Sequence, residues 1–325
     1  MLFRVTNAKG ATMGQQRQTD LARVLFPVEK RPIYVFDGRT YREEKRFHAI
    51  VDVEKNHTFA VVSKDYHLVT NREAFELGRL FFRHVFSAAT ADDMEIFNII
   101  QPATRSFCHI DFLHKARALV IQKGDTWFPY LRVTNSYNRT KPLCFDIGFC
   151  RAICTNGMIF GKQNVVLRYY HTREHITLSP ILEVEANRLK KMEADFIGHM
   201  HRLREVDIPK ENMFALACKA FGITITAEDL CKPQRRQRLL GLRDEIHRLA
   251  DKYFAEMGGN GYAAINVLTD FATRPGAYTP QKSMIHSLQK RCGDWLVGFL
   301  EAVNTRPFNL QEYLGGSLEA ANILA

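Results

Sequence analysis

We expect the chain to be organised around the stretch Trp127–Thr172, WFPYLRVTNSYNRTKPLCFDIGFCRAICTNGMIFGKQNVVLRYYHT. Two apolar runs flank a polar and basic segment, and this pattern is typical of a β-hairpin whose strands lie in the core of a sheet. Pro142 cannot donate a hydrogen bond to a neighbouring strand, so it marks the point where the second strand begins. We therefore expect a central hairpin with its tip at residues 135–142.

The second strand of this hairpin carries a cation on its apolar face. Side chains alternate between the two faces of a strand. One face holds Leu143, Phe145, Ile147, Phe149 and Ile153, and Arg151 lies in the same register. A buried guanidinium needs a compensating partner. Three alternatives stay open: an internal ion pair, for example with Asp146 or Asp111; a phosphate or partner contact near the strand end; or a bulge that turns Arg151 outward.

The tip combines amides, hydroxyls, one aromatic ring and two cations. Such a segment can hold a phosphate backbone, with Arg139 and Lys141 on phosphates and the ring of Tyr137 stacked on a base. The same composition is typical of a solvated hairpin end. The loop Thr155-Asn156-Gly157 follows the second strand and has the residues of a tight turn.

The overall charge favours an anionic partner. The chain has 325 residues, a formal net charge of +10 and a pI of about 9.3. A basic balance in a globular protein is typical of nucleic-acid binding, although it also serves solubility. Cations gather between Lys232 and Lys252. No apolar run has the length of a membrane span and residues 1–30 lack a signal core, so we expect a cytoplasmic protein with no membrane partner.

The order of apolar patterns predicts an α+β fold, with a sheet-rich, largely antiparallel N-terminal half and a helical C-terminal half. Residues 1–30 are expected to form a mobile N-terminal arm, residues 31–178 an α+β sheet domain with the central hairpin, and residues 179–325 a helical domain. In the sheet domain we expect a strand at Ile33–Phe36, a hairpin of Phe47–Val53 with Thr58–Ser63, and a helix from Arg72 to Val85 capped by Asn71. One further helix is expected over Leu310–Leu324.

Catalytic patterns are few. His171, Glu174 and His175 spell H-x-x-E-H, the pattern of inverted zinc peptidases, which requires both histidines on one helical face. Here the pattern follows a strand-like run and precedes Pro180, a context that favours extended structure. We therefore predict neither a metal site nor a cofactor.

Several short motifs, in order along the chain, resemble those of the phage- and plasmid-associated family catalogued as domain of unknown function 932. They are Tyr66–Phe75, Asn135-Ser136-Tyr137, Arg151-x-x-Cys154-x-Asn156-Gly157, Tyr170-His171-Thr172 and Asn266-Val-Leu-Thr269-Asp270. The resemblance covers roughly residues 45–305. Where the family has Asp-Gly after its Asn-Ser-His hairpin, this chain has Asn138-Arg139. The resemblance implies mobile elements and host–element conflict as context, without a settled activity.

The leading hypothesis is a mobile-element protein that binds nucleic acid, DNA in preference to RNA, through a basic surface without catalysis. The residues predicted to bind nucleic acid are Asn135, Ser136, Tyr137, Arg139, Lys141, Arg151, Asn156, Arg235, Arg236 and Arg238. One alternative is an assembly module, as a homo-oligomer or with a partner protein of a mobile element or defence system. Its basis is the set of large apolar residues Trp295, Leu296, Phe299, Leu300 and Phe308. The other is an enzyme of unrecognised type, zinc-dependent in its most concrete form.

Overall fold

The computed structural model describes residues 13–86, 91–152, 156–160, 167–169, 179–276, 283–305 and 307–324. Its contacts divide the chain into two units. Unit 1 contains Met1–Ala116, Tyr130–Asp146 and Val165–Leu189, and unit 2 contains Arg117–Pro129, Ile147–Asn164 and Lys190–Ala325. Antiparallel sheets dominate the N-terminal half and helices the C-terminal half, which confirms the predicted α+β class.

Unit 1 begins with helix α1 (Met13–Val24), followed by a small antiparallel sheet in the order β1-β2-β3. Its strands are β1 (Val28–Phe36), β2 (Tyr41–Asp52) and β3 (His57–Ser63). The predicted arm over residues 1–30 includes helix α1 and the start of β1. The polar run at residues 14–18 suggested irregular chain, but glutamine and arginine are good helix formers, and Val24 is buried at the end of the helix.

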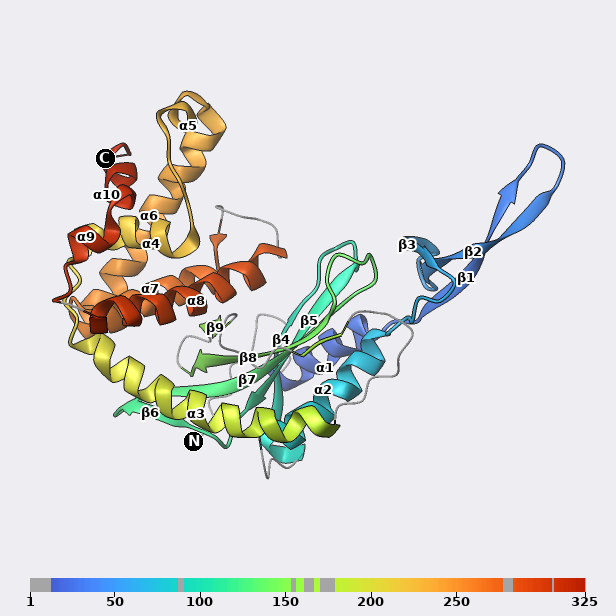
Figure 1. Ribbon diagram of the computed structural model, residues 1–325, viewed down its shortest axis with the longest axis horizontal. Helices are drawn as coiled ribbons and strands as arrows, with labels where there is room; N and C mark the ends of the chain where they lie inside the picture. The colour runs from blue at the N-terminus through green and yellow to red at the C-terminus, as the bar shows by residue number, and fades with distance from the viewer. Residues whose placement is uncertain are drawn as a thin grey trace. The chain divides into compact units, whose positions relative to one another are not determined.

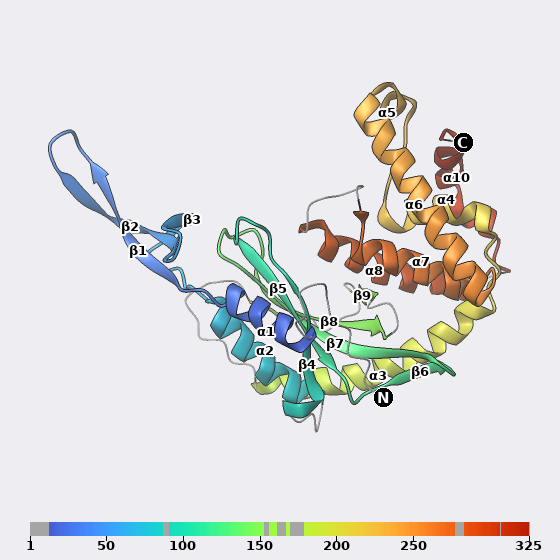
Figure 2. The same ribbon diagram turned by 180° about the vertical axis from the view of Figure 1, so that it is seen from behind.

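The outer part of this small sheet has only two strands. β3 pairs with β2 between Phe47 and Asp52, whereas β1 continues along β2 to the pair Phe36–Tyr41. Both ribbon views show this two-stranded end extending past β3 (Figures 1 and 2). We call Tyr34–Glu43, including its turn, the outer ribbon.

The base of the small sheet is fixed to the rest of unit 1. Phe26 and Ile50 belong to a buried cluster together with Tyr137 from the central hairpin. Arg105 binds Asp52 at 3.1 Å and Glu54 at 2.9 Å, and its guanidinium lies 3.5 Å from the ring centre of Phe26. The buried apolar cluster and the ion pairs of Arg105 therefore fix the base of the small sheet, from which the outer ribbon extends.

The larger sheet contains the predicted central hairpin, β7 (Asp125–Ser136) and β8 (Leu143–Arg151). Its main path is β10-β8-β7-β5-β4, with β6 beside β7 and β9 beside β8. The other strands are β4 (Met94–Ile100), β5 (Phe107–His114), β6 (Leu119–Gln122), β9 (Gly157–Ile159) and β10 (Leu167–Tyr169), with a short 3-10 turn at Ala91–Asp93. β7 and β8 contribute residues to both units.

Helix α2 (Asn71–Val85) packs on the sheet within unit 1. The ring centres of Phe75 and Phe112 are 5.4 Å apart, and a Cβ added at Gly78 would lie 2.5 Å from Val133. The predicted cap at Asn71 is wrong by one residue. Thr70 caps the helix and forms a capping box with Glu73, because its hydroxyl accepts from the Glu73 amide while the Glu73 carboxylate accepts from the Thr70 amide.

Unit 2 is mainly helical. It holds the C-terminal part of α3 (Ser179–Arg204), then α4 (Met213–Phe221), α5 (Ala227–Cys231), α6 (Pro233–Met257), α7 (Gly261–Thr273), α8 (Ser283–Thr305), α9 (Leu310–Leu314) and α10 (Gly316–Asn322), with a 3-10 turn at Lys210–Asn212. The single helix predicted over Leu310–Leu324 is interrupted at Gly315, whose φ of 48° lies outside the right-handed helical region.

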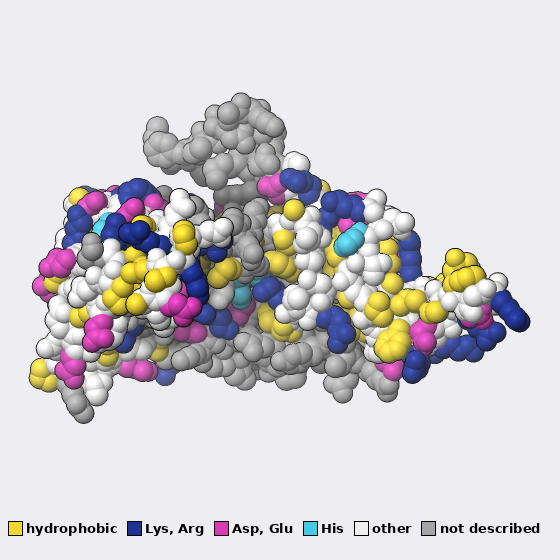
Figure 3. Space-filling model, turned by 90° about the horizontal axis from the view of Figure 1, so that it is seen from above, with side chains coloured by type: hydrophobic (Ala, Val, Ile, Leu, Met, Phe, Trp, Pro, Cys, Tyr) yellow, Lys and Arg dark blue, Asp and Glu magenta, His cyan; other side chains and the backbone are white. Residues whose placement is uncertain are grey.

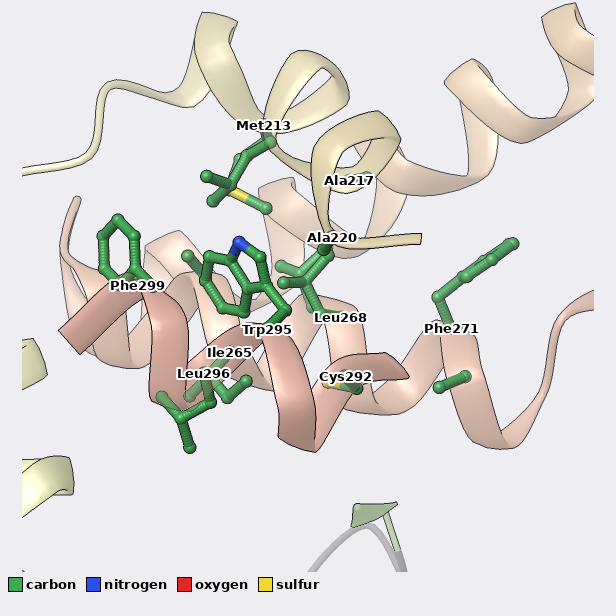
Figure 4. Packing of buried hydrophobic residues seen from close by; sticks show 14 of the residues in the cluster. Met213, Ala217, Ala220, Ile265, Leu268, Phe271, Cys292, Trp295, Leu296 and Phe299 are labelled. Atoms are coloured by element: carbon green, nitrogen blue, oxygen red, sulfur yellow. The ribbon is translucent and has the colours of Figure 1, made fainter. Parts of the chain in front are cut away.

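Helices α4, α7 and α8 share one buried cluster (Figure 4). Its labelled members are Met213, Ala217, Ala220, Ile265, Leu268, Phe271, Cys292, Trp295, Leu296 and Phe299. Phe308 is partly buried against the same cluster. The apolar residues that suggested an assembly surface therefore fill the helical core. In the described chain, no helix combines the length and apolar character needed to cross a membrane.

Candidate nucleic-acid interface

Tyr137 lies at the tip of the central hairpin, but its ring is buried. The ring packs against Phe26 and Phe59, with centre-to-centre distances of 5.6 and 5.3 Å. Its hydroxyl oxygen accepts a 2.7 Å hydrogen bond from the Asn71 amide at the start of α2, and burial raises the pKa of Tyr137. The ring is therefore not available for base stacking, which corrects the role inferred from sequence.

Asn135 and Ser136 are also buried and serve the fold. The Asn135 Nδ2 donates to the Val69 carbonyl at 3.0 Å and to the Asn71 Oδ1 at 2.9 Å. The Ser136 hydroxyl donates to the Lys141 carbonyl and accepts from the Lys141 amide, closing the tip. The Asn-Ser-Tyr motif thus joins the hairpin to the first turn of α2.

The two cations of the tip differ in exposure. Arg139 is exposed, with a φ of 62° that places it in the left-handed region. Lys141 is half-buried, its ammonium lies 5.2 Å from the ring centre of Phe107, and burial lowers its pKa. Arg139 is thus the tip residue best placed to reach a phosphate.

Arg151 lies on the core face, as its register predicted, and forms an internal ion pair. Its Nε and Nη2 donate to the two carboxylate oxygens of Asp125 at 2.7 and 3.0 Å. Asp125 Oδ2 also accepts from the Tyr262 hydroxyl at 2.7 Å, and that hydroxyl accepts from Trp127 Nε1 at 2.9 Å. The partner is neither of the two carboxylates suggested from sequence: Asp111 instead pairs with Arg132. A phosphate contact through Arg151 would require breaking this buried pair.

Asn156 belongs to a second polar network in unit 2. Its Nδ2 donates to the Tyr253 hydroxyl at 2.9 Å, and its Oδ1 accepts from Arg274. The Tyr253 hydroxyl donates in turn to Asp270 at 2.7 Å, and Lys252 lies 3.5 Å from the same carboxylate. The Asp270 carboxylate therefore accepts a hydrogen bond from the Tyr253 hydroxyl and lies next to the cations Lys252 and Arg274. Both polar atoms of the Asn156 side chain form hydrogen bonds inside unit 2.

The first turns of α6 carry a cluster of exposed cations. Lys232 pairs with Glu228 at 2.6 Å, and Arg235 lies 3.5 Å from Asp229. Arg236 and Arg238 are exposed, and neither has a carboxylate partner within the described chain. This cluster, from Lys232 to Arg238, has more cations than nearby carboxylates.

The predicted weak metal ligands His171, Glu174 and His175 lie outside the described residues. Among the residues that the structure does describe, no group of three histidine, cysteine or carboxylate side chains could hold a metal ion.

The family model described as "Domain of unknown function (DUF932)" matches residues 58–292, which is more than half of the chain. The chain belongs to this family. The motif resemblance is thereby confirmed. No curated protein and no solved structure matched in the corresponding searches.

Within the DUF932 match, two separate sequence segments meet in the Asp270 network. Asn156 follows β8, whereas Asp270 and Arg274 lie on and after α7, and these residues are hydrogen-bonded together. Both segments carry family-like motifs, yet their spacing in the sequence did not reveal the contact.

The outer ribbon ends at Glu43, before residue 58, so it lies outside the family match. Its aromatic residues were missed as functional candidates. The available signal was that the apolar run Ile33–Phe36 continues directly to the Asp37-Gly38 turn.

Proposed function

We propose that this DUF932 protein binds nucleic acid without catalysis, through exposed cations that include Arg139 and the cluster at the start of α6. The proposal depends mainly on one observation: Arg236 and Arg238 are exposed and have no carboxylate partner in the described chain. Cations of this kind are free to replace the counterions of a phosphate backbone, and the release of those counterions drives binding.

The neighbouring ion pairs support the same proposal. Lys232 and Arg235 are paired with exposed or half-exposed carboxylates, and surface pairs of this type contribute about 0–1 kcal/mol. Exchange of these carboxylates for phosphates therefore costs little. The net charge of +10 adds long-range attraction for a polyanion.

DNA is the ligand proposed in preference to RNA, in the cytoplasm and in the context of a mobile element. This part of the proposal rests on the resemblance of the motifs to phage- and plasmid-associated proteins. The assembly alternative, as a homo-oligomer or with a protein of a mobile element or defence system, has lost its sequence basis, because Trp295 and Phe299 are buried in the core of unit 2.

The test is a fluorescence anisotropy titration with labelled single- and double-stranded DNA and RNA at about 50 mM and about 200 mM salt. We expect binding that weakens steeply with salt, and weaker binding by the Arg236→Glu, Arg238→Glu variant. The matched control is Lys55→Glu with Lys123→Glu, which changes the net charge equally at two exposed turns. No binding to any of the four ligands at low salt contradicts the proposal. Equal losses in the two variants would show that overall charge, rather than the α6 cluster, determines affinity.

A further inference from the structure

The outer ribbon exposes an aromatic strip. Tyr34, Phe36 and Tyr41 are 57%, 57% and 71% exposed, and Val35 and Phe47 nearby are also exposed. These five are half of the ten large exposed hydrophobic residues in the described chain. Single exposed apolar residues are ordinary, but a concentration of this kind marks an interaction site.

Strand register places the three rings on one face. Phe36 pairs directly with Tyr41, and Tyr34 is two residues from Phe36 on the same strand. Directly paired residues, and residues two apart on a strand, share a face of the ribbon. The ring centres of Phe36 and Tyr41 are 5.2 Å apart and the rings are tilted by 46°. β3 ends its pairing at Phe47, so within the described residues no third strand pairs with this part of the ribbon.

The turn that carries the strip is well ordered by its own hydrogen bonds. Asp37 Oδ1 accepts from the amides of Arg39 and Thr40 at 3.0 and 2.9 Å, and the Asp37 amide donates to the Thr40 carbonyl. Gly38 supplies the positive φ of 94° that the turn requires. The backbone that carries the rings is therefore held in a closed turn, which lowers the entropic cost of ordering this segment on binding.

Four cations lie on or next to the outer ribbon, and the exposed residue Glu43 pairs in register with Tyr34. Arg39 at the turn and Lys45 on β2 are exposed, and neither has a carboxylate partner within the part of the chain described here. Arg42 and Arg46 are bound to Asp37 and Glu44 in exposed pairs. The space-filling view shows yellow hydrophobic and dark-blue cationic side chains next to each other over this end of unit 1, at the right of Figure 3.

We infer that the outer ribbon is a binding site for single-stranded nucleic acid, in which bases stack on Tyr34, Phe36 and Tyr41 while Arg39 and Lys45 contact phosphates. The inference rests on the proposed function and names the element and strand form involved. Aromatic rings flanked by cations are the combination that binds single strands, because every unpaired base offers a face for stacking. In a duplex the faces of the bases are covered by their neighbours, so exposed rings gain little from it.

The experiment compares the full-length protein with its Tyr34→Ala, Phe36→Ala, Tyr41→Ala variant in anisotropy titrations on single-stranded DNA and on a duplex. We expect at least about a tenfold loss of affinity for the single strand and less than about a threefold change for the duplex. Tyr34→Phe with Tyr41→Phe keeps the rings and is expected to bind as the wild type. The matched control Leu80→Ala, Met284→Ala, Ile323→Ala removes three other exposed apolar side chains and is expected to leave both affinities unchanged.

A second measurement uses the unaltered protein, so it does not depend on the folding of a variant. Ultraviolet crosslinking to a single strand containing 5-bromouracil is expected to label Tyr34, Phe36 or Tyr41, as read by peptide mass spectrometry. Crosslinks found only elsewhere overturn the inference. Single-strand binding by the triple alanine variant at wild-type strength also overturns the inference. In that case the proposed function is not contradicted. If the wild type binds no nucleic acid, both fail. If the triple variant keeps its affinity but loses a dimer seen by light scattering, the strip instead contacts a second copy.

Discussion

Arg151 is buried and donates two hydrogen bonds to the carboxylate of Asp125. We expect Arg151→Ala to lower the free energy of unfolding by about 3–5 kcal/mol, because it leaves the Asp125 carboxylate buried beside the Tyr262 hydroxyl without its cation. Urea denaturation followed by circular dichroism measures this. Arg139→Ala is the control, with an expected change within about 0.5 kcal/mol because that side chain is exposed. A variant at Arg151 that unfolds like the wild type would contradict the importance of this pair.

Tyr137 gives a second prediction about a single residue. Tyr137→Phe keeps the ring between Phe26 and Phe59 but removes the hydroxyl that accepts from the Asn71 amide. An unsatisfied buried amide costs about 1–3 kcal/mol, so the free energy of unfolding is expected to fall by that amount. The affinity for nucleic acid is expected to stay unchanged in the anisotropy assay. A loss of affinity without a loss of stability would restore Tyr137 as a binding residue.

At the scale of elements, two glycines of α8 experience different surroundings. A Cβ at Gly293 would lie 2.2 Å from the Ile159 carbonyl oxygen of β9, whereas nothing lies within 4 Å of a Cβ at Gly298. We expect Gly293→Ala to destabilise by about 1–3 kcal/mol, since backbone must move to admit the methyl group. Gly298→Ala should be neutral or stabilise by up to about 1 kcal/mol through its helix propensity. Thermal melts of the two variants test this, and equal melting temperatures would argue against a close approach of α8 to β9.

The elements themselves were largely predictable, whereas their contacts were not. Alternation and helical periodicity identified the central hairpin, the core register of Arg151 and helix α2, because these patterns are local. The cap of α2 was misplaced by one residue, since Thr70 and Asn71 are both good caps and only the Glu73 contact decides between them. Tyr137 was predicted to be exposed because hairpin tips usually are, and burial by Phe26 and Phe59 comes from chain distant in sequence.

The structure agrees with the predicted fold class, but it places several of the predicted binding residues in the interior. Of the predicted nucleic-acid-binding residues, Asn135, Ser136, Tyr137, Arg151 and Asn156 are buried and hydrogen-bonded within the protein, while Arg139, Arg236 and Arg238 are exposed. Sequence shows that a cation or a ring is present but not whether it has a partner. In the outer ribbon, the apolar run Ile33–Phe36 predicted a strand but not the exposure of its rings.

Salt dependence separates the two kinds of contact proposed for this protein. Each phosphate contact makes the negative slope of log association constant against log salt steeper by about 0.7–0.9. Loss of two contacts in Arg236→Ala with Arg238→Ala is therefore expected to make the slope shallower by about 1.5. Tyr34→Ala, Phe36→Ala, Tyr41→Ala removes stacking rather than charge, so single-strand affinity should fall at every salt concentration with the slope unchanged within about 0.5. Anisotropy titrations at four or more salt concentrations give both slopes. A flattened slope in the aromatic variant would mean that the rings act by positioning Arg39 and Lys45 on phosphates, and an unchanged slope in the arginine variant would remove the start of α6 from the interface.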